Sequence, residues 1–282
     1  MQESDIRIQH YRDLVEENLE RCLPVGGAEQ PDLLKAMRYS LSGGKRFRPV
    51  LTLACGAAAG GSPESVIPAG LAMECIHASS LILDDLPSMD NGMYRRGHRA
   101  THLVFGESTA VLAAHALLAH AFRLLAGNAA DAAVSKETGL WVIGRVADCL
   151  GLEGLAGGQY MDLEAASGST GYPVGVKTIH ARKTASLFVA SATAGAALCG
   201  AGDDTLRMLA SYAEYLGLAF QSVDDALDTG ERGTPGDPET ARRTAMAEAN
   251  EFTQQAMSAI QPLGTNGVTL AYLATMMIRR GS

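Results

Sequence analysis

The 282-residue sequence contains few aromatic residues: they make up 5% of it, although 47% of its residues are hydrophobic. Alternating runs of Val, Ile, Thr and Tyr, which are typical of strands, are nearly absent. This scarcity argues against a sheet-based fold. Alanine and leucine supply most of the apolar content, and both favour helices that pack closely on small side chains. We therefore expect an all-α protein.

Cysteines are few, scattered and odd in number, and none forms a CxxC pair. This usage argues against a disulfide framework and against a thiolate zinc site, and it is typical of small buried residues in a reducing cytoplasm. The five positions are Cys22, Cys55, Cys75, Cys149 and Cys199.

Basic residues are also few relative to acidic ones, so the net charge is −8. A nucleic-acid-binding protein would normally carry a basic face, so we expect no nucleic-acid partner. The first ten residues, MQESDIRIQH, lack the apolar core of a signal peptide. No run reaches the roughly 18 uncharged apolar residues expected of a membrane span, and histidines interrupt the closest one, at 108–121. We expect a cytoplasmic protein without a transmembrane segment.

Helical periodicity extends through almost the whole chain, with Gly and Pro marking the breaks. No internal repeat and no long polar linker is present, so we expect a single domain over residues 1–282. The expected helices cover residues 4–22, 32–42, 47–60, 64–86, 107–127, 130–150, 152–166, 173–181, 184–200, 203–228, 238–261 and 265–280.

Two aspartate clusters, far apart in the chain, each follow an apolar run: DDLPSMD at 84–90 and DDALD at 224–228. Asp224 and Asp228 are four residues apart and share one face of a helix. The proline in the first cluster suggests that the helix loosens there. Carboxylates gathered in this way need a counter-cation, and oxygen ligands without His or Cys favour Mg²⁺, which commonly binds phosphate as well. The alternative is two solvated helix ends.

The long apolar helices at 64–86 and 203–228 are expected to form the central pair of a bundle and to bring both clusters to one end. Basic residues could meet them there. GGKRFRP at 43–49 places cations at a glycine turn before a helix, and RRG at 95–97 follows the first cluster closely. A solvated basic turn and simple charge pairing are the alternatives.

Three further residues align with the clusters. Lys183 begins an apolar helix, and Gln221 lies three residues before Asp224 on the same helix face. His77 lies two turns before Asp84, also on the same face. It is either a functional group or a satisfied core histidine.

Taken together, these segments resemble the trans-isoprenyl diphosphate synthases, most closely the bacterial geranylgeranyl diphosphate synthases. The resemblance covers roughly residues 30–230. The matching segments are GGKRFRP (43–49), ECIHASSLILDDLPSMD (74–90), RRG (95–97), HLVFGE (102–107), GLAGGQYMDL (154–163), RKTASLF (182–188) and GLAFQSVDDALD (217–228).

The resemblance implies an isoprenoid synthase-type helical bundle with a central active-site cavity, assembled as a homodimer. It also implies Mg²⁺-dependent head-to-tail condensation of isopentenyl diphosphate with dimethylallyl, geranyl or farnesyl diphosphate. Three Mg²⁺ ions would be held by Asp84, Asp85, Asp90, Asp224 and Asp228, with Asp225 nearby. The residues implied to assist allylic diphosphate binding are Arg95, Lys183, Thr184 and Gln221. Those implied to orient isopentenyl diphosphate are Lys45, Arg48, His77 and Arg96.

The expected product follows from the helix before the first cluster. Position 79 lies about 7.5 Å deeper than Asp84 at 1.5 Å per residue, and in the family an aromatic residue there favours farnesyl diphosphate. Ser79 and Ser80 are small, so the tunnel is expected to continue toward Ile76. Geranylgeranyl diphosphate is therefore the expected product, with farnesyl diphosphate as the alternative.

The chain departs from the family pattern after the second cluster. The family normally has two flap lysines there, whereas this chain reads TGERGTPGDPE at 229–239 and contains no lysine after Lys183. Two other functions therefore stay open. A terpene cyclase or a prenyltransferase for another acceptor is opposed by the retained Lys45, Arg48 and His77. A non-catalytic partner subunit is opposed by the full set of six aspartates.

Overall fold

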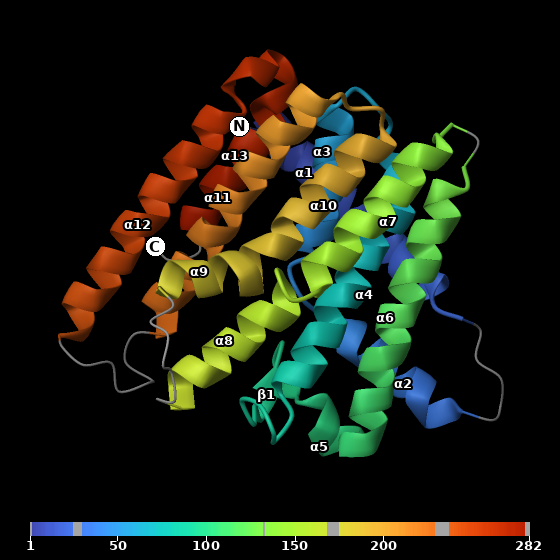
Figure 1. Cartoon of the computed structure of the whole chain (residues 1–282), viewed down its shortest axis with the longest axis vertical. Coiled ribbons are helices and arrows are strands. Elements are labelled where there is room, and N and C mark those ends of the chain that lie inside the picture. The colour runs from blue at the N-terminus through green and yellow to red at the C-terminus, as the bar shows by residue number, and fades with distance from the viewer. Residues whose placement is uncertain (1, 25–29, 132, 168–174, 229–236, 280–282) are drawn as a thin grey trace.

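The structure, a computed structural model, describes residues 2–24, 30–131, 133–167, 175–228 and 237–279. Within these ranges the regular elements are helices and one two-stranded hairpin (Figure 1). In chain order they are α1 (Gln2–Cys22), α2 (Pro31–Leu41), α3 (Phe47–Ala58), η1 (Pro63–Val66), α4 (Ile67–Asp84), β1 (Tyr94–Arg95), β2 (His98–Arg99), α5 (Thr101–Phe105), α6 (Glu107–Ala129), α7 (Lys136–Leu150), α8 (Leu155–Ser167), α9 (Val176–His180), η2 (Ala181–Ala185), α10 (Ser186–Leu198), α11 (Asp203–Asp228), α12 (Pro238–Ala259), η3 (Gln261–Gly267) and α13 (Val268–Ile278).

Helix starts follow capping signals in the sequence. Ser135 accepts a hydrogen bond from the backbone N–H of Thr138 and caps α7, which therefore begins later than the expected residue 130. Asp237 caps α12 by accepting from the backbone N–H groups of Glu239 and Thr240. The all-α expectation is confirmed, and most of the expected helices are present with shifted ends.

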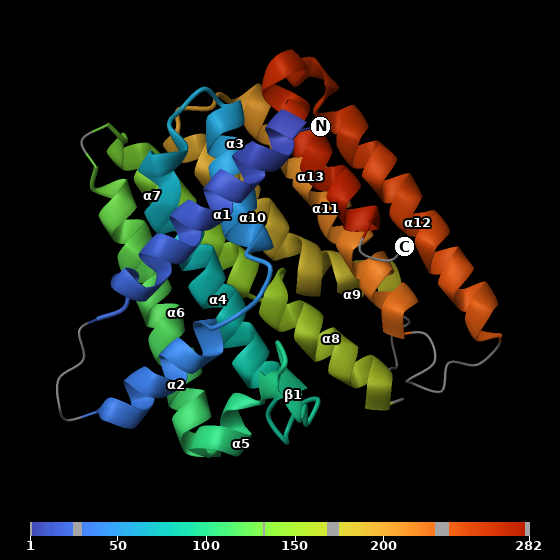
Figure 2. The same cartoon turned by 180° about the vertical axis from the view of Figure 1, so that it is seen from behind.

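The two helices that carry the aspartate clusters, α4 and α11, pack on different partners. α4 packs on α6 and α3, whereas α11 packs on α12 and α10, and α3 and α10 pack on each other. Small residues permit this contact: a Cβ atom added to Gly195 of α10 would lie 2.0 Å from the carbonyl oxygen of Thr52 in α3. Figure 2 shows α1 crossing the back of α3 and α4. The expected direct pairing of the two long helices is therefore replaced by a layered arrangement.

The hairpin and α5 are absent from the sequence-based expectation. Tyr94 pairs with Arg99, and Arg95 pairs with His98, across a turn formed by Arg96 and Gly97. Both turn residues have positive φ, 54° and 79°, as a tight hairpin turn of this type requires. Two-residue strands are too short to produce an alternating pattern in the sequence. The hairpin nevertheless positions Arg95 and Arg96.

The expected break between the helices at 173–181 and 184–200 does not exist in the described part of this segment. α9 runs through η2, a turn of π-helix, into α10 (Figure 1). A π turn inside a helix commonly marks a functional site. Here it contains Arg182, Lys183 and Thr184.

Among the described residues, two helices are long and apolar enough to cross a membrane by length and composition, in contrast to the expectation from the sequence. They cover Pro63–Asp84 and Glu107–Ala129. In the first, 67% of the most apolar window is buried inside the protein, as in the core helix of a soluble protein; in the second, only 39% is buried. The exposed residues of α6 include the large apolar side chains of Val111 and Leu112.

Candidate active site

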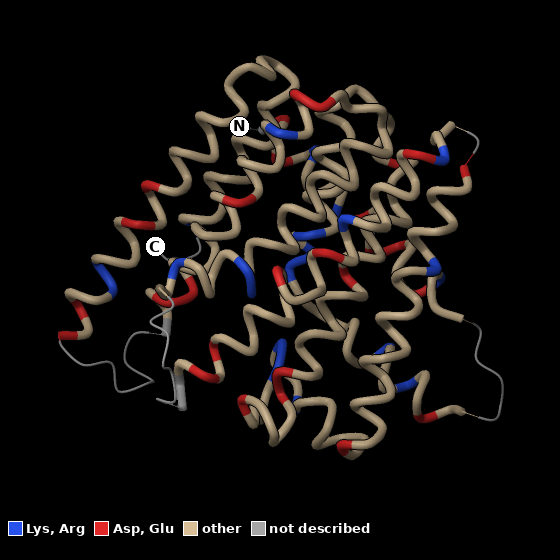
Figure 3. Tube along the Cα trace, in the orientation of Figure 1, with Lys and Arg blue, Asp and Glu red and all other residues tan. Residues whose placement is uncertain are grey.

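A cavity of about 650 Å³ lies between the α3–α4 and α10–α11 layers. Basic and acidic residues lie near one another along the chain trace in the middle of the molecule, in the region of α4, α8 and η2 (Figure 3). The cavity wall comes from the turn before α3, from the start of α3, and from α4, the hairpin, α8, η2, α10 and α11. Its lining residues are Gly44, Lys45, Arg46, Phe47, Arg48, Glu74, His77, Ser80, Leu81, Asp84, Arg95, Arg96, Leu155, Gln159, Lys183, Thr184, Leu187, Phe220 and Asp224.

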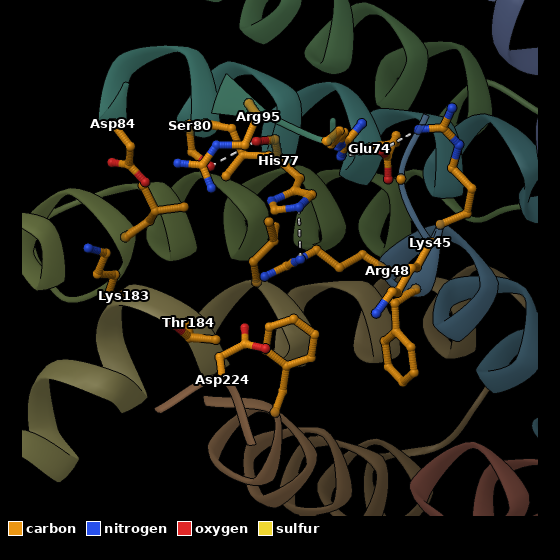
Figure 4. A pocket seen from close by; sticks show the side chains of 18 of the residues that line it. Lys45, Arg48, Glu74, His77, Ser80, Asp84, Arg95, Lys183, Thr184 and Asp224 are labelled. Carbon is orange, nitrogen blue, oxygen red and sulfur yellow. Dashed lines mark hydrogen bonds and ion pairs between the residues drawn. The ribbon is translucent and has the colours of Figure 1, made fainter. Parts of the chain in front are cut away.

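One aspartate from each cluster lines the cavity, Asp84 from α4 and Asp224 from α11 (Figure 4). Burial raises the pKa of Asp84 to about 6; Lys183 opposes this shift, and the charge of Asp90 adds to it. A buried carboxylate with acidic neighbours is costly to ionise without a cation. The structure thus brings the two clusters to one cavity.

Asp85, by contrast, is not among the residues that line the cavity, and it is 2% exposed. Arg95 Nη2 donates to its Oδ1 atom at 2.6 Å, and Arg95 Nε donates to the same oxygen at 3.1 Å. A Cβ atom on Gly92 would lie 2.5 Å from that oxygen, so the loop packs tightly over the pair. In this structure Asp85 holds Arg95, and Arg95 lines the cavity.

The other cluster members border the site. Asp90 is exposed, and its backbone N–H donates to the carbonyl oxygen of Asp84 at 2.9 Å, which returns the loop to the helix end. Asp225 accepts from Gln221 Nε2 at 3.0 Å, and Gln221 Oε1 accepts from the Thr184 hydroxyl at 2.8 Å. The side chain of Asp228 and the segment 229–236 lie outside the described residues.

The donor set around Asp84 consists of carboxylate oxygens, which fits Mg²⁺ rather than zinc. Among the described residues, no three or more His, Cys, Asp or Glu side chains are gathered closely enough to hold an ion by themselves. This does not conflict with Mg²⁺ chemistry, because Mg²⁺ usually binds one or two carboxylates, several waters and the phosphates of a substrate. Asp84 and Asp224 are the aspartates that line the cavity, and the assignment of Mg²⁺ to Asp84, Asp85, Asp90, Asp224 and Asp228 stays a prediction.

The other end of the cavity carries the cations expected from the sequence: Lys45, Arg48 and Arg96 line it together with His77. Arg48 Nη1 lies 3.2 Å from His77 Nε2 (Figure 4). The Arg48 guanidinium also lies 4.8 Å from the ring centre of Phe188. These four residues line the same cavity, and the prediction that they orient isopentenyl diphosphate stays a prediction.

Burial controls protonation at this end. It lowers the pKa of His77 well below its usual value, and the charge of Arg48 lowers it further. Burial also lowers the pKa of Arg48, to about 10, so the guanidinium keeps its charge at neutral pH. A neutral imidazole therefore lies beside a cation that can receive an anionic ligand.

Sequence reasoning missed a buried ion-pair network behind this group. Glu74 Oε1 accepts from Arg46 Nη1 at 2.8 Å and from Arg96 Nη2 at 2.9 Å. Arg46 Nε also donates to Glu16 Oε1 at 2.8 Å. Arg46 has a positive φ of 51°, is 3% exposed and lines the cavity together with Lys45 and Arg48. One available signal was Glu74, a lone carboxylate three residues before His77 in an apolar helix.

Helix α8 meets the π turn so closely that only glycine fits. A Cβ atom on Gly158 would lie 2.3 Å from the backbone nitrogen of Lys183. One turn further along α8, Asp162 accepts a hydrogen bond from Lys183 Nζ at 2.6 Å. The segment GLAGGQYMDL contained these residues, but their partner becomes visible only in the fold.

Of the three positions expected to set the product chain length, only one lines the described cavity. Ser80 lines the cavity, and its hydroxyl donates to the carbonyl oxygen of His77 at 2.9 Å. The hydroxyl of Ser79 donates to the carbonyl oxygen of Ala114 in α6 at 2.8 Å. Ile76 is 1% exposed and belongs to the core. Ser79 and Ile76 thus face the α6 side of α4 rather than the described cavity.

Comparison with known proteins identifies the family of this chain. A family model described as polyprenyl synthetase matches residues 30–250. A dimethylallyltranstransferase of Fischerella ambigua (strain UTEX 1903) is 38% identical, over 95% of this chain and 81% of its own length. A geranylgeranyl diphosphate synthase of Cyanophora paradoxa is 41% identical, over 77% of this chain and 71% of its own length.

Solved structures share the fold over nearly the whole chain. A geranyltransferase from Legionella pneumophila superposes with a TM-score of 0.88 at 28% identity and covers 99% of this chain and 98% of that chain. Fold and site together define an all-α prenyltransferase. The chain belongs to the polyprenyl synthetase family.

Proposed function

We propose that this enzyme condenses isopentenyl diphosphate head to tail with an allylic diphosphate and releases a short-chain prenyl diphosphate and inorganic diphosphate. One observation carries the proposal: a single cavity has a carboxylate-and-lysine end and a separate arginine–histidine end. Two anionic substrates need two such places. The family and its named relatives support the same reaction.

We assign the allylic diphosphate to the end formed by Asp84, Asp224, Lys183 and Thr184. Asp84, Asp90 and Asp224 would hold Mg²⁺, three ions in our proposal, and the metal would supply Lewis-acid stabilisation of the diphosphate leaving group. Lys183 and Arg95 add fixed positive charge at the same end. As the allylic C–O bond breaks, its electron pair leaves with the diphosphate, and these charges stabilise the anion that departs.

We assign isopentenyl diphosphate to Lys45, Arg48, His77 and Arg96. Its double bond then attacks the allylic carbon, a new C–C bond forms, and the proton that is lost passes to the departed diphosphate. Apolar side chains between the two ends exclude water, which would otherwise quench the allylic cation. They are Phe47, Leu81, Leu155, Leu187 and Phe220.

We propose geranylgeranyl diphosphate as the product, with farnesyl diphosphate as the alternative. Small residues on α4 support this, because Ser80 at the cavity wall leaves room for a growing chain. The test is incubation of the protein with Mg²⁺, isopentenyl diphosphate and, separately, dimethylallyl, geranyl or farnesyl diphosphate, followed by mass spectrometry of the products. A C20 diphosphate is the expected result.

Other results would identify other functions. Hydrocarbon or alcohol formed from the allylic diphosphate alone would indicate cyclisation. Absence of turnover with every primer would indicate a partner subunit or a different acceptor.

We further propose a cytoplasmic homodimer. The adjacent helices α6 and α7 expose large apolar side chains: Leu112 is 57% exposed and Leu140 is 72% exposed. Apolar surface of this kind marks an interaction face, and the pair lies at one edge of the molecule (Figure 1). All five cysteines are free thiols, which accords with a reducing compartment.

A further inference from the structure

Two cysteines meet where α1 packs on α4, outside the described cavity. In α1, Cys22 continues at helical spacing the buried stripe that contains Val15 and Leu19, so it lies on the face that packs against the core. In α4, Cys75 is 0% exposed. Cys22 is partly exposed, and both cysteines are free thiols. The pair therefore joins a buried thiol to one that solvent reaches.

The register of α4 and α6 places a histidine opposite Cys75. The Ser79 hydroxyl donates to the carbonyl oxygen of Ala114 at 2.8 Å, and a second hydrogen bond, nearer the start of α4 and the end of α6, shows that the two helices run antiparallel. Cys75 lies one turn before Ser79, and His120 lies less than two turns after Ala114, so the two side chains come to the same level. His120 is 5% exposed, and its Nε2 atom has no hydrogen-bond partner among the described residues. A buried imidazole nitrogen of this kind calls for an explanation.

The two thiols differ in their protonation. In its thiol form Cys22 donates to the carbonyl oxygen of Leu19 at 3.0 Å. A hydrogen bond from Cys75 lowers the pKa of Cys22 well below its usual value; burial opposes this shift, and His120 and the charge of Arg123 add to it. The same pairing, together with burial, raises the pKa of Cys75. At neutral pH a thiolate therefore lies beside a protonated thiol.

This arrangement is typical of cysteines that respond to oxidants, because an accessible thiolate reacts with a peroxide and a second thiol beside it resolves the product. A metal site is a poorer explanation, since no three or more His, Cys, Asp or Glu side chains among the described residues are gathered to hold an ion. Cys199 provides the contrast. It is also partly exposed, but burial raises its pKa.

We propose that Cys22 and Cys75 form a redox-sensitive pair: hydrogen peroxide oxidises Cys22, and Cys75 then closes a disulfide that joins α1 to α4. The Cys22 thiolate attacks one peroxide oxygen and becomes a sulfenic acid, while the other oxygen leaves as hydroxide and takes up a proton to form water. The Cys75 sulfur then attacks the Cys22 sulfur, the S–O bond breaks, and the hydroxyl group leaves as water with the Cys75 proton. The two thiols supply the two electrons that reduce the peroxide. This pair functions independently of which diphosphates the enzyme binds.

The disulfide would reinforce a connection that already exists between the two helices. Arg46 donates to Glu16 of α1 and to Glu74 of α4, each at 2.8 Å, and Glu74 directly precedes Cys75. A bond between the cysteines closes a loop of about 50 residues, which restricts the unfolded chain and thereby stabilises the fold.

The test begins with the wild-type protein, which is reduced, treated with hydrogen peroxide at pH 7 and digested without reductant for mass spectrometry. We expect a disulfide between Cys22 and Cys75 that dithiothreitol reverses. Cys22 should react at least about 10-fold faster than Cys199, because the thiolate rather than the thiol attacks peroxide. The melting temperature should rise by about 5 °C or more on oxidation and return on reduction.

Three variants separate the roles of the residues. Cys75→Ser should leave Cys22 as a sulfenic acid that dimedone labels, whereas Cys199→Ser, the matched control, should still form the disulfide. His120→Gln should slow the oxidation of Cys22 several-fold at pH 7. At pH 9 it should regain the wild-type rate, because a cysteine thiol ionises there without help.

Equal oxidation rates of Cys22 and Cys199 in the wild-type protein would overturn the proposal. Oxidation of Cys22 to sulfinic acid without a disulfide, or a disulfide to a different cysteine, would overturn it as well. Both results come from the wild-type protein, so they decide even if a variant does not fold. A wild-type rate for His120→Gln at pH 7 would overturn only the role of His120.

Discussion

Replacement of Glu74 by Gln should destabilise the protein substantially while leaving its fold intact. The Glu74 side chain is 2% exposed, as is that of Arg46, and one carboxylate oxygen serves both Arg46 and Arg96 at 2.8 and 2.9 Å. Removal of one partner from a buried ion pair leaves an uncompensated charge and costs about 3–5 kcal/mol. Glu16 remains beside Arg46 with a side chain that is 48% exposed. Because of this remaining partner, we expect about 3 kcal/mol, the lower end of that range.

Thermal unfolding followed by far-UV circular dichroism measures this loss. For a chain of this size, about 3 kcal/mol corresponds to a fall in melting temperature of roughly 6–12 °C. Glu20→Gln, an exposed position on α1, is the control and should change the melting temperature by less than about 2 °C. A fall of less than 2 °C for Glu74→Gln would show that the network contributes little.

The same variant should separate the two substrates kinetically. Arg96 loses its anchor, and Arg96 lines the isopentenyl end of the cavity. The KM for isopentenyl diphosphate should therefore rise several-fold more than the KM for geranyl diphosphate. Equal changes in both constants would contradict the assignment of that end.

Four further predictions follow from individual contacts. Asp84→Asn should abolish turnover yet stabilise the metal-free protein at pH 7–8 by about 3 kcal/mol. The reason is that the fold raises the pKa of Asp84 to about 6. The protonated carboxyl stabilises the wild-type protein, and this stabilisation is lost as the pH rises through about 6. The free energy of unfolding of the variant, measured from about pH 5 to 8, should not show this fall. Asp162→Asn should loosen Lys183 and raise the KM for the allylic diphosphate, with the KM for isopentenyl diphosphate as the internal comparison. Leu112→Glu should shift a dimer toward monomer in light scattering, and an unchanged mass would exclude α6 as the interface. Ser80→Phe should shorten the main product to C15 or less by mass spectrometry, whereas the isosteric control Ser80→Cys should keep the wild-type product.

The helical content of the fold and several helix ends could be predicted from the sequence because they depend on local chemistry. An Ala- and Leu-rich chain with Gly and Pro breaks forms helices, and capping residues such as Ser135 determine where they begin. The hairpin at Tyr94–Arg99 escaped prediction because two-residue strands leave no periodic signal. The break expected near residue 182 was wrong because a π turn, which needs no Gly or Pro, carries the helix through.

At the site, helical spacing along α4 determined which of its side chains lie on one face, and the tertiary structure places that face at the cavity. His77, Ser80 and Asp84 share a face of α4 because of their spacing, and all three line the cavity. The residue types also indicated the chemistry, since carboxylates at one end and arginines at the other suit a metal-bound diphosphate and a second anion.

Only the tertiary structure decided which element meets each face. Asp85 adjoins Asp84 in sequence, yet it pairs with Arg95 because the hairpin folds back onto the helix end. In the sequence, nothing distinguishes Gln159 from other polar residues. In the structure, α8 packs on Lys183, and the amide of Gln159 is buried without a hydrogen-bond partner among the described residues. The physical reason is that burial and pairing arise from contacts between helices distant along the chain, and no local pattern specifies those contacts.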